Sequence, residues 1–169
     1  MHRHVNLILS LFLMLTLLMV SGCTTSEVLR EVMDPKNILS DKTKLDLTIT
    51  MAADLNPDQN GRPSPVVVRI YSLKSPSIFE NTDYVSLYFN DKQVLGADFA
   101  GMEEHDFRPS QVFKAQLEFN EKANFVGFLV AFQDIEQSRW RMVLPLERKQ
   151  HNEIHLKLTR NSIVLVQED

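Results

Sequence analysis

The chain has 169 residues, enough for one domain or for one domain behind a targeting segment. Apolar residues make up 44% and charged residues 24%, with five glycines and seven prolines, which excludes disordered, collagen-like and coiled-coil compositions. The net charge of −4 provides no positive field for a polyanion, so we expect no nucleic-acid partner. A single cysteine excludes an intramolecular disulfide and any multi-cysteine metal site.

The N-terminal segment has the layout of a secretory signal. Arg3 precedes an apolar run from Val5 to Val20, which is shorter than the about 20 residues that a membrane-spanning helix needs. Ser21, Gly22 and Cys23 follow. This order of apolar, small, small and cysteine resembles the bacterial lipobox, in which the thiol accepts a diacylglyceryl group. An ordinary secretory signal beside a cysteine is the alternative.

Lipidation of Cys23 defines the expected organisation of the chain. Residues 1–22 would be the lipoprotein signal peptide, residues 23–43 the lipidated cysteine and its tether, and residues 44–169 the folded domain. Two or more acyl chains hold a protein stably on a membrane. Thr24, not aspartate, follows the cysteine, which resembles the pattern that sends enterobacterial lipoproteins to the outer membrane. We therefore expect a lipid-anchored protein that faces the periplasm.

The mature chain reads as a series of short strands. Residues 45–51 alternate apolar and polar side chains, the period of a half-buried strand. Residues 125–132 are almost all apolar and predict a central strand that is buried on both faces. Further strands are expected at 66–71, 113–119, 140–144 and 154–158, and a seventh at 163–166, either paired directly or continuing after a bend.

Two stretches of the mature chain do not follow the strand pattern. Between residues 76 and 92, Tyr84, Leu87 and Tyr88 have helical spacing and predict one or two short helices. Residues 96–111 are acidic and rich in turn formers, so a loop is expected there. The predicted fold is mainly β: a two-sheet β-sandwich with a short helical insertion after the second strand.

The connection between the first two strands, residues 55–64, is unusually long for a hairpin loop of about 2–5 residues. Its prolines stiffen it, which reduces the entropy lost on binding. Several polar side chains accompany them, including Arg62, and arginine is a frequent hot-spot residue. On these residues alone, a partner surface and a merely long solvated connection are equally favoured.

Several motifs together resemble one family. They are Leu55-Asn56-Pro57-Asp58, Gly61-Arg62-Pro63-Ser64-Pro65 running into residues 66–73, Val126-Gly127-Phe128 and Trp140-Arg141. The chain resembles the TssJ (SciN/VasD) family, the outer-membrane lipoproteins of the type VI secretion system, over roughly residues 44–166. The resemblance implies a transthyretin-like two-sheet β-sandwich with added helices. It also implies an anchor in the inner leaflet of the outer membrane.

The same resemblance implies a partner and a site. Members of the family bind the periplasmic C-terminal region of TssM, and through it are linked to TssL. The usual contact is the loop between the first two strands. The partner-binding residues implied here are Asn56, Pro57, Asp58, Gln59, Asn60, Gly61, Arg62 and Pro63.

Two other classes of function can be stated against this one. A periplasmic lipoprotein that carries a small apolar ligand would need a deep pocket, lined by Phe125, Phe128 and Trp140. An enzyme would need converging polar residues, but Gly-x-Ser-x-Gly, Walker A and His-Glu-x-x-His sequences are absent. His151 and His155 lack a third metal ligand, and the acidic run 103–106 lacks calcium-loop spacing. We expect no enzyme, no metal and no cofactor beyond the lipid on Cys23.

The lipobox interpretation makes a direct prediction. Cys23→Ser removes the lipid acceptor, so the precursor should fold but lose its anchor. Fractionation of cell envelopes should find the wild type with the outer membrane and the variant outside that fraction. A variant that remained with the outer membrane would contradict the lipobox.

Overall fold

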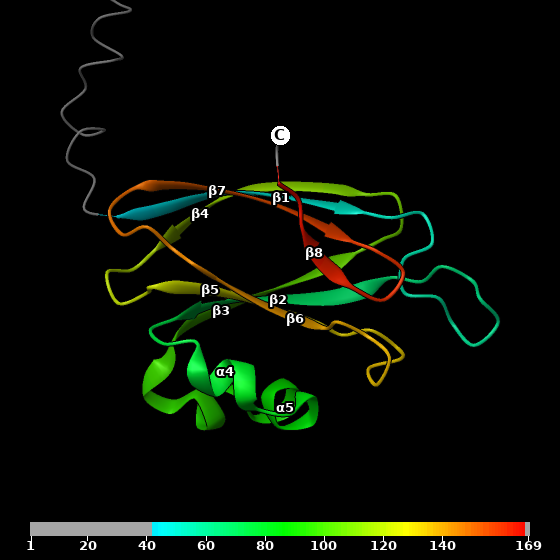
Figure 1. Cartoon of the computed structure of the whole chain (residues 1–169), viewed down its shortest axis with the longest axis horizontal. Coiled ribbons are helices and arrows are strands. Elements are labelled where there is room, and N and C mark those ends of the chain that lie inside the picture. Colours follow the sequence, from blue (N-terminus) through cyan, green and yellow to red (C-terminus); the bar gives the residue numbers. More distant parts are fainter. Residues whose placement is uncertain (1–41, 168–169) are drawn as a thin grey trace, which may run out of the picture. The chain divides into compact units, whose positions relative to one another are not determined.

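The computed structural model describes residues 42–167. The signal peptide, Cys23 and nearly all of the tether lie outside these residues. The described part is a two-layer β-sandwich with a helical layer on the outer side of one sheet (Figure 1). The predicted β-sandwich is therefore confirmed.

Each sheet has four strands. The first sheet has the order β4-β1-β7-β8, with β1 at Thr43–Met51, β4 at Val112–Phe119, β7 at His151–Leu158 and β8 at Ile163–Leu165. The second has the order β3-β2-β5-β6, with β2 at Val66–Leu73, β3 at Phe99–Phe107, β5 at Phe125–Val130 and β6 at Arg141–Pro145.

The strand pairing is antiparallel except at the centre of the first sheet. There β1 runs parallel to β7, so that Leu47 lies opposite Ile154, and antiparallel to β4, where Leu47 lies opposite Ala115. Leu45, Leu47 and Ile49 point into the space between the sheets and are fully enclosed. The residues between them face outward, because successive side chains in a strand alternate sides.

The two central strands of the second sheet, β2 and β5, are buried on both faces. Val126 and Phe128 of β5 join the core between the sheets, whereas Leu129 joins a second apolar cluster under the helices. The sequence prediction of a central strand buried on both sides is thus confirmed. The second cluster consists of Tyr71, Leu73, Phe79, Leu87, Leu95 and Leu129.

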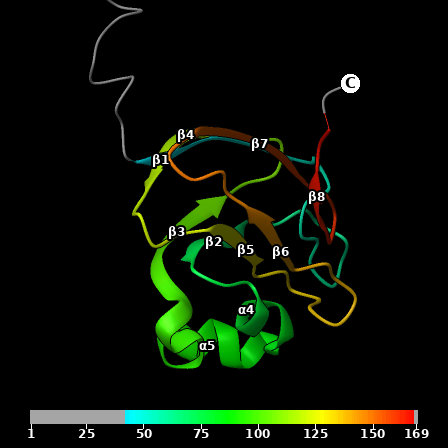
Figure 2. The same ribbon diagram turned by 60° about the vertical axis from the view of Figure 1, so that its left-hand side comes forward.

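Helices α4 (Ser77–Asn81) and α5 (Tyr84–Leu95), followed by the 3-10 turn η1 (Gly96–Asp98), form the outer layer (Figure 2). Phe79 of α4 and Leu87 of α5 are fully enclosed against the second sheet. Asp83 caps α5, because its side chain accepts a hydrogen bond from the Ser86 N–H. The predicted helical insertion after the second strand is confirmed.

Two arginines attach this layer to the sheet. Arg69 of β2 donates from Nε to Glu104 Oε2 at 2.6 Å, and its guanidinium lies 4.1 Å above the Tyr88 ring of α5. Arg141 of β6 donates from Nη1 to the carbonyl oxygens of Phe79 (3.1 Å) and Thr82 (2.6 Å). The Arg141 bonds satisfy carbonyls at the end of α4. Together with the Arg69 contact on α5, they hold both helices in place.

The prediction of a loop at residues 96–111 is wrong, because most of that segment forms η1 and the nine-residue strand β3. β3 is an edge strand that pairs only with β2. Polar residues, including Glu103 and Glu104, are exposed along this strand, as an edge strand allows. The segment therefore lacks the apolar alternation that marks the other strands.

The pocket expected for a carrier of apolar ligands does not form from its expected residues. Phe128 is fully enclosed in the core between the sheets, whereas Phe125 packs on the helical side of the same sheet. Trp140 is half-buried, with its ring 5.3 Å from that of Tyr84 in an edge-to-face contact. Because Phe125 and Phe128 lie on opposite faces of one sheet, they do not line a common cavity.

Gly127 allows the helical layer to approach the sheet, and its replacement gives a stability prediction. A Cβ at this position would lie 2.8 Å from Leu73 Cδ1 and 3.2 Å from Phe79 Cζ. Gly127→Ala should therefore lower the free energy of unfolding by roughly 1–3 kcal/mol through overpacking. Urea unfolding, followed by the fluorescence of Trp140, measures this change.

Gly101→Ala is the matched control, because Gly101 also lies in a strand of the same sheet, but a Cβ there would make ordinary contacts with the Ser72 side chain, at 3.6 Å from Oγ and 3.8 Å from Cβ. This substitution should leave stability unchanged or raise it by up to about 1 kcal/mol, since it restricts the unfolded chain. Equal losses for both alanine variants would contradict the packing argument.

Candidate functional site

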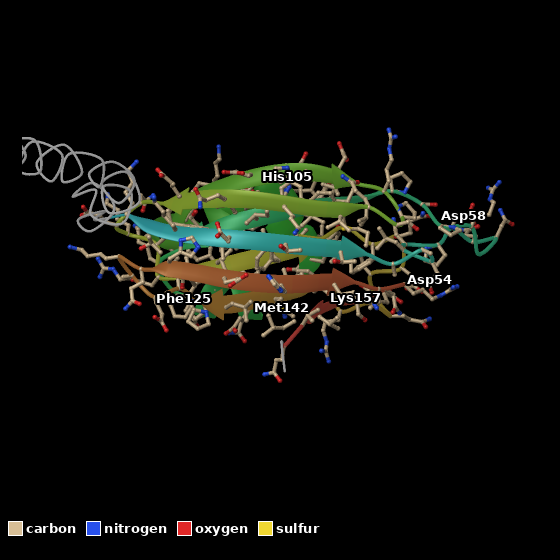
Figure 3. All side chains as sticks on the ribbon, turned by 90° about the horizontal axis from the view of Figure 1, so that it is seen from above. Asp54, Asp58, His105, Phe125, Met142 and Lys157 are labelled. Atoms are coloured by element: carbon tan, nitrogen blue, oxygen red, sulfur yellow. The ribbon has the colours of Figure 1, made fainter. Side chains whose placement is uncertain are left out.

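The long connection between β1 and β2 projects from one end of the sandwich (Figure 1). Figure 3 shows Asp58 on this projection and Phe125 towards the other end of the domain. β1 begins at Thr43, at the end away from the loop. The folded domain therefore presents the loop at the end opposite to the point where the chain enters.

Asp58 folds the tip of the loop around its own carboxylate. Oδ1 accepts hydrogen bonds from the backbone N–H of Asn60 (2.8 Å) and of Arg62 (2.9 Å). Oδ2 accepts from Arg62 Nε at 2.8 Å and lies 2.7 Å from Arg62 Nη2, a two-pronged ion pair. The Arg62 N–H and then its side chain, which both hydrogen-bond the charged form, hold the pKa of Asp58 below its usual value.

The backbone closes the same turn. The Asp58 N–H donates to the Arg62 carbonyl at 2.9 Å, and the Gly61 N–H donates to the Asp58 carbonyl at 2.8 Å. Gly61 has a φ of 77°, a conformation that glycine adopts without strain. Glycine at this position thus allows the tight turn at the tip of the loop.

Asn56 fixes the base of the loop and is only 3% exposed. Its side-chain amide donates to the Pro65 carbonyl at 2.6 Å, and its Oδ1 accepts from the Gln133 N–H at 2.8 Å. The Asn56 N–H donates to the Arg160 carbonyl at 2.9 Å. Asn56, one of the predicted partner-binding residues, therefore points inward: its side chain and its N–H together join three connections.

The other predicted residues differ in exposure. Gln59, Asn60, Gly61, Arg62 and Pro63 are exposed, and Pro57 and Asp58 are half-buried. The outward chemistry of the loop consists of two amides, one guanidinium and a proline ring. These are groups that hydrogen-bond and pack against another protein.

A hollow of about 500 Å³ lies beside the loop. Asn56 to Gln59 form one wall, residues 132–134 and 137 a second, and Arg160 and Asn161 a third. Sequence reasoning missed the last two groups, which come from the β5–β6 and β7–β8 connections. No local motif marks them, because only the sandwich brings these three connections to one end.

Residues 42–167 contain no group of three or more histidine, cysteine or acidic side chains that could hold a metal ion. His151 opens β7, and its Nε2 lies 2.6 Å from Asp46 Oδ2. Within the same range, no helix is long and apolar enough to cross a membrane.

The family comparison decides the identity of the fold. The model of the type VI secretion lipoproteins (T6SS-SciN, also described as VasD, EvfM and TssJ) matches residues 43–161. The chain belongs to this family. The match covers β1 to β7 and includes the projecting loop, so the resemblance seen in the motifs is confirmed.

Solved structures agree with this assignment. TssJ1, the type VI lipoprotein of Pseudomonas aeruginosa, is 26% identical, with a TM-score of 0.73 over 76% of this chain and 98% of that one. A chain of a type VI membrane complex is 27% identical (TM-score 0.66, 74% and 98%). A chain in a structure described as the TssM C-terminal domain from EAEC is 25% identical (TM-score 0.63, 75% and 99%). Comparison with curated protein sequences gave no match.

The hydrogen bonds at the tip of this TssJ-family loop lead to a prediction for the titration of Asp58. Because the pKa of Asp58 is depressed from 3.8, its carboxylate orders the tip above pH 4, and this contribution disappears as the pH falls through the depressed pKa. Arg62→Gln removes the guanidinium but keeps the backbone N–H, so the Asp58 midpoint should move part of the way back towards 3.8. Carbon-detected NMR of the carboxyl group measures both midpoints.

Lys122→Gln is the matched control, because it removes an exposed cation from the β4–β5 turn, away from Asp58. Its Asp58 midpoint should equal that of the wild type. An unchanged midpoint in Arg62→Gln would show that the ion pair does not form in solution.

Proposed function

We propose that this lipoprotein anchors the type VI secretion membrane complex to the outer membrane by binding the periplasmic C-terminal region of TssM. Family membership supports the secretion role. Chains of the same fold occur in a type VI membrane complex and in a structure described as the TssM C-terminal domain, and almost their whole length aligns with this chain. TssL would be reached indirectly, through TssM.

The observation that carries the proposed site is the ordered exposure of the loop tip. The Asp58–Arg62 pair and the turn at Gly61 fold the tip before any partner arrives. Little conformational entropy then remains to be lost on binding. Gln59, Asn60, Arg62 and Pro63 project from this folded tip and form the contact surface.

The lipid anchor is the second part of the proposal. Cys23 is the only cysteine of the chain and would carry the lipid of this lipoprotein. The folded domain begins at β1, and the loop lies at the far end of that nine-residue strand. Nine residues of strand span about 30 Å, so the chain enters the folded domain about 30 Å from the base of the loop.

The proposed role is structural, not catalytic. The family consists of secretion lipoproteins, and the polar groups of the loop already bond one another, as Asp58 and Arg62 do. The lipid on Cys23 and the loop would therefore act as two attachment points. One holds the outer membrane and the other holds TssM.

Three substitutions at the tip test the site: Gln59→Ala, Asn60→Ala and Arg62→Ala combined. With the lipidated protein in detergent, affinity for the periplasmic region of TssM should fall at least tenfold, or about 1.4 kcal/mol. Interferometry measures the affinity. The melting temperature should hardly change, because all three side chains are exposed.

The matched control carries Glu121→Ala, Lys122→Ala and Gln150→Ala, three exposed polar residues in the turns at the other end of the sandwich. Its affinity should stay within about twofold of the wild type. Equal weakening by both triple variants would remove the loop from the interface. Unchanged binding by the tip variant would do the same.

A further inference from the structure

The helical layer carries two neighbouring apolar side chains that face solvent. Val85 is 61% exposed and Phe89 is 71% exposed. They lie four residues apart in the regular part of α5, before the break at Asn90, so they share one side of the helix. We call these two residues the α5 patch.

The α5 patch lies outside the two apolar clusters of the domain, although the Phe89 ring contacts that of Tyr88 edge-to-face, with centroids 5.1 Å apart. Leu87 lies on the opposite side of the helix and is fully enclosed against the second sheet, as is Leu95. α5 itself lies in the outermost layer of the domain (Figure 2). Val85 and Phe89 therefore point away from the sandwich, on a platform that Arg69 and Arg141 hold rigidly.

We propose that the α5 patch rests on the lipid bilayer into which the acyl chains of Cys23 insert. The bilayer is inferred as the partner of the patch from the position of the lipidated cysteine and the length of chain that connects it to the domain. Residues 24–41, 18 in number, connect the lipidated cysteine to the domain. A chain of this length, fully extended, reaches about 60 Å.

This reach suits the dimensions of the domain. Two sheets lie about 10 Å apart, and a packed helix adds roughly another 10 Å. The tether can therefore leave β1 and still allow α5 to lie on the membrane. Because the anchor keeps the domain close to the bilayer at all times, its effective concentration there is high, and a contact of two side chains suffices.

The charges near the α5 patch indicate the kind of lipid contact. Glu80 and Asp83 precede the patch, and Lys92 follows it. The surroundings are acidic on balance, so attraction to anionic headgroups does not drive the contact. Burial of an aromatic ring and a branched aliphatic side chain at the headgroup boundary drives the contact. We therefore expect the contact to be insensitive to salt.

The α5 patch and the loop tip occupy different sides of the domain. The helices cover the outer face of the second sheet, whereas the loop projects from the end of the strands (Figure 1). When α5 lies on the bilayer, the loop extends alongside the membrane and not into it. Both contacts can therefore be made together.

Phe89→Trp places a reporter in the patch while keeping an aromatic ring. The lipidated protein is reconstituted into vesicles of phosphatidylethanolamine and phosphatidylglycerol with brominated acyl chains. The added tryptophan should lose at least half of its emission and shift to the blue, at low and at high salt alike. Addition of Val85→Asp should abolish both effects, because a charge beside the ring opposes its insertion.

Val112→Trp is the matched control, since Val112 is 55% exposed but lies on β4, the edge strand of the other sheet. Its emission should not respond to brominated lipid. If Phe89→Trp is quenched no more than Val112→Trp, the proposal is overturned, and the patch belongs to a protein partner or a second copy of the chain. This proposal rests on the lipid anchor of the proposed function, and flotation with the vesicles tests that anchor separately.

Discussion

The structure depends on one constraint: the sheet β3-β2-β5-β6 must be covered on both faces. The other sheet covers one face, and among the described residues the helices between β2 and β3 cover the second. β5 has no polar face to offer to water, because Val126, Phe128 and Leu129 are all enclosed. Gly127 is important because it has no side chain, and Phe79 occupies the space that a Cβ would need.

The helical layer also requires polar attachments. α4 is only five residues long and would not hold its conformation alone. Arg141 supplies donors to two carbonyls at its end, and Arg69 bonds Glu104 while stacking on the Tyr88 ring. Burial, the largest influence, raises the pKa of the Tyr71 hydroxyl, which stays neutral and donates to Asp91 at 3.1 Å. Apolar packing and these bonds together make a stiff platform.

The rigid sandwich brings three separate connections together at one end of the domain. Asn56 bonds to the β2 entry and to the β5–β6 connection through its side chain, and to the β7–β8 turn through its N–H. It tolerates a positive φ of 47°, which asparagine does more readily than most residues. The tip beyond it is then free to present side chains, because the base needs no help from a partner. The loop tip and the helical layer thus occupy different sides of one small domain.

The sequence alone determined the fold class, the helical insertion and the position of the long loop. Periodicity sufficed where one face of a strand is buried, as at 45–51, and where both are, as in β5. It failed at β3, because polar residues such as Glu103 and Glu104 replace the apolar alternation that β4, also an edge strand, retains. Only the tertiary structure decided that Asn56 points inward and that Gln133 and Arg160 meet it, because hydrogen bonds between residues 77 or more positions apart leave no local pattern in the chain.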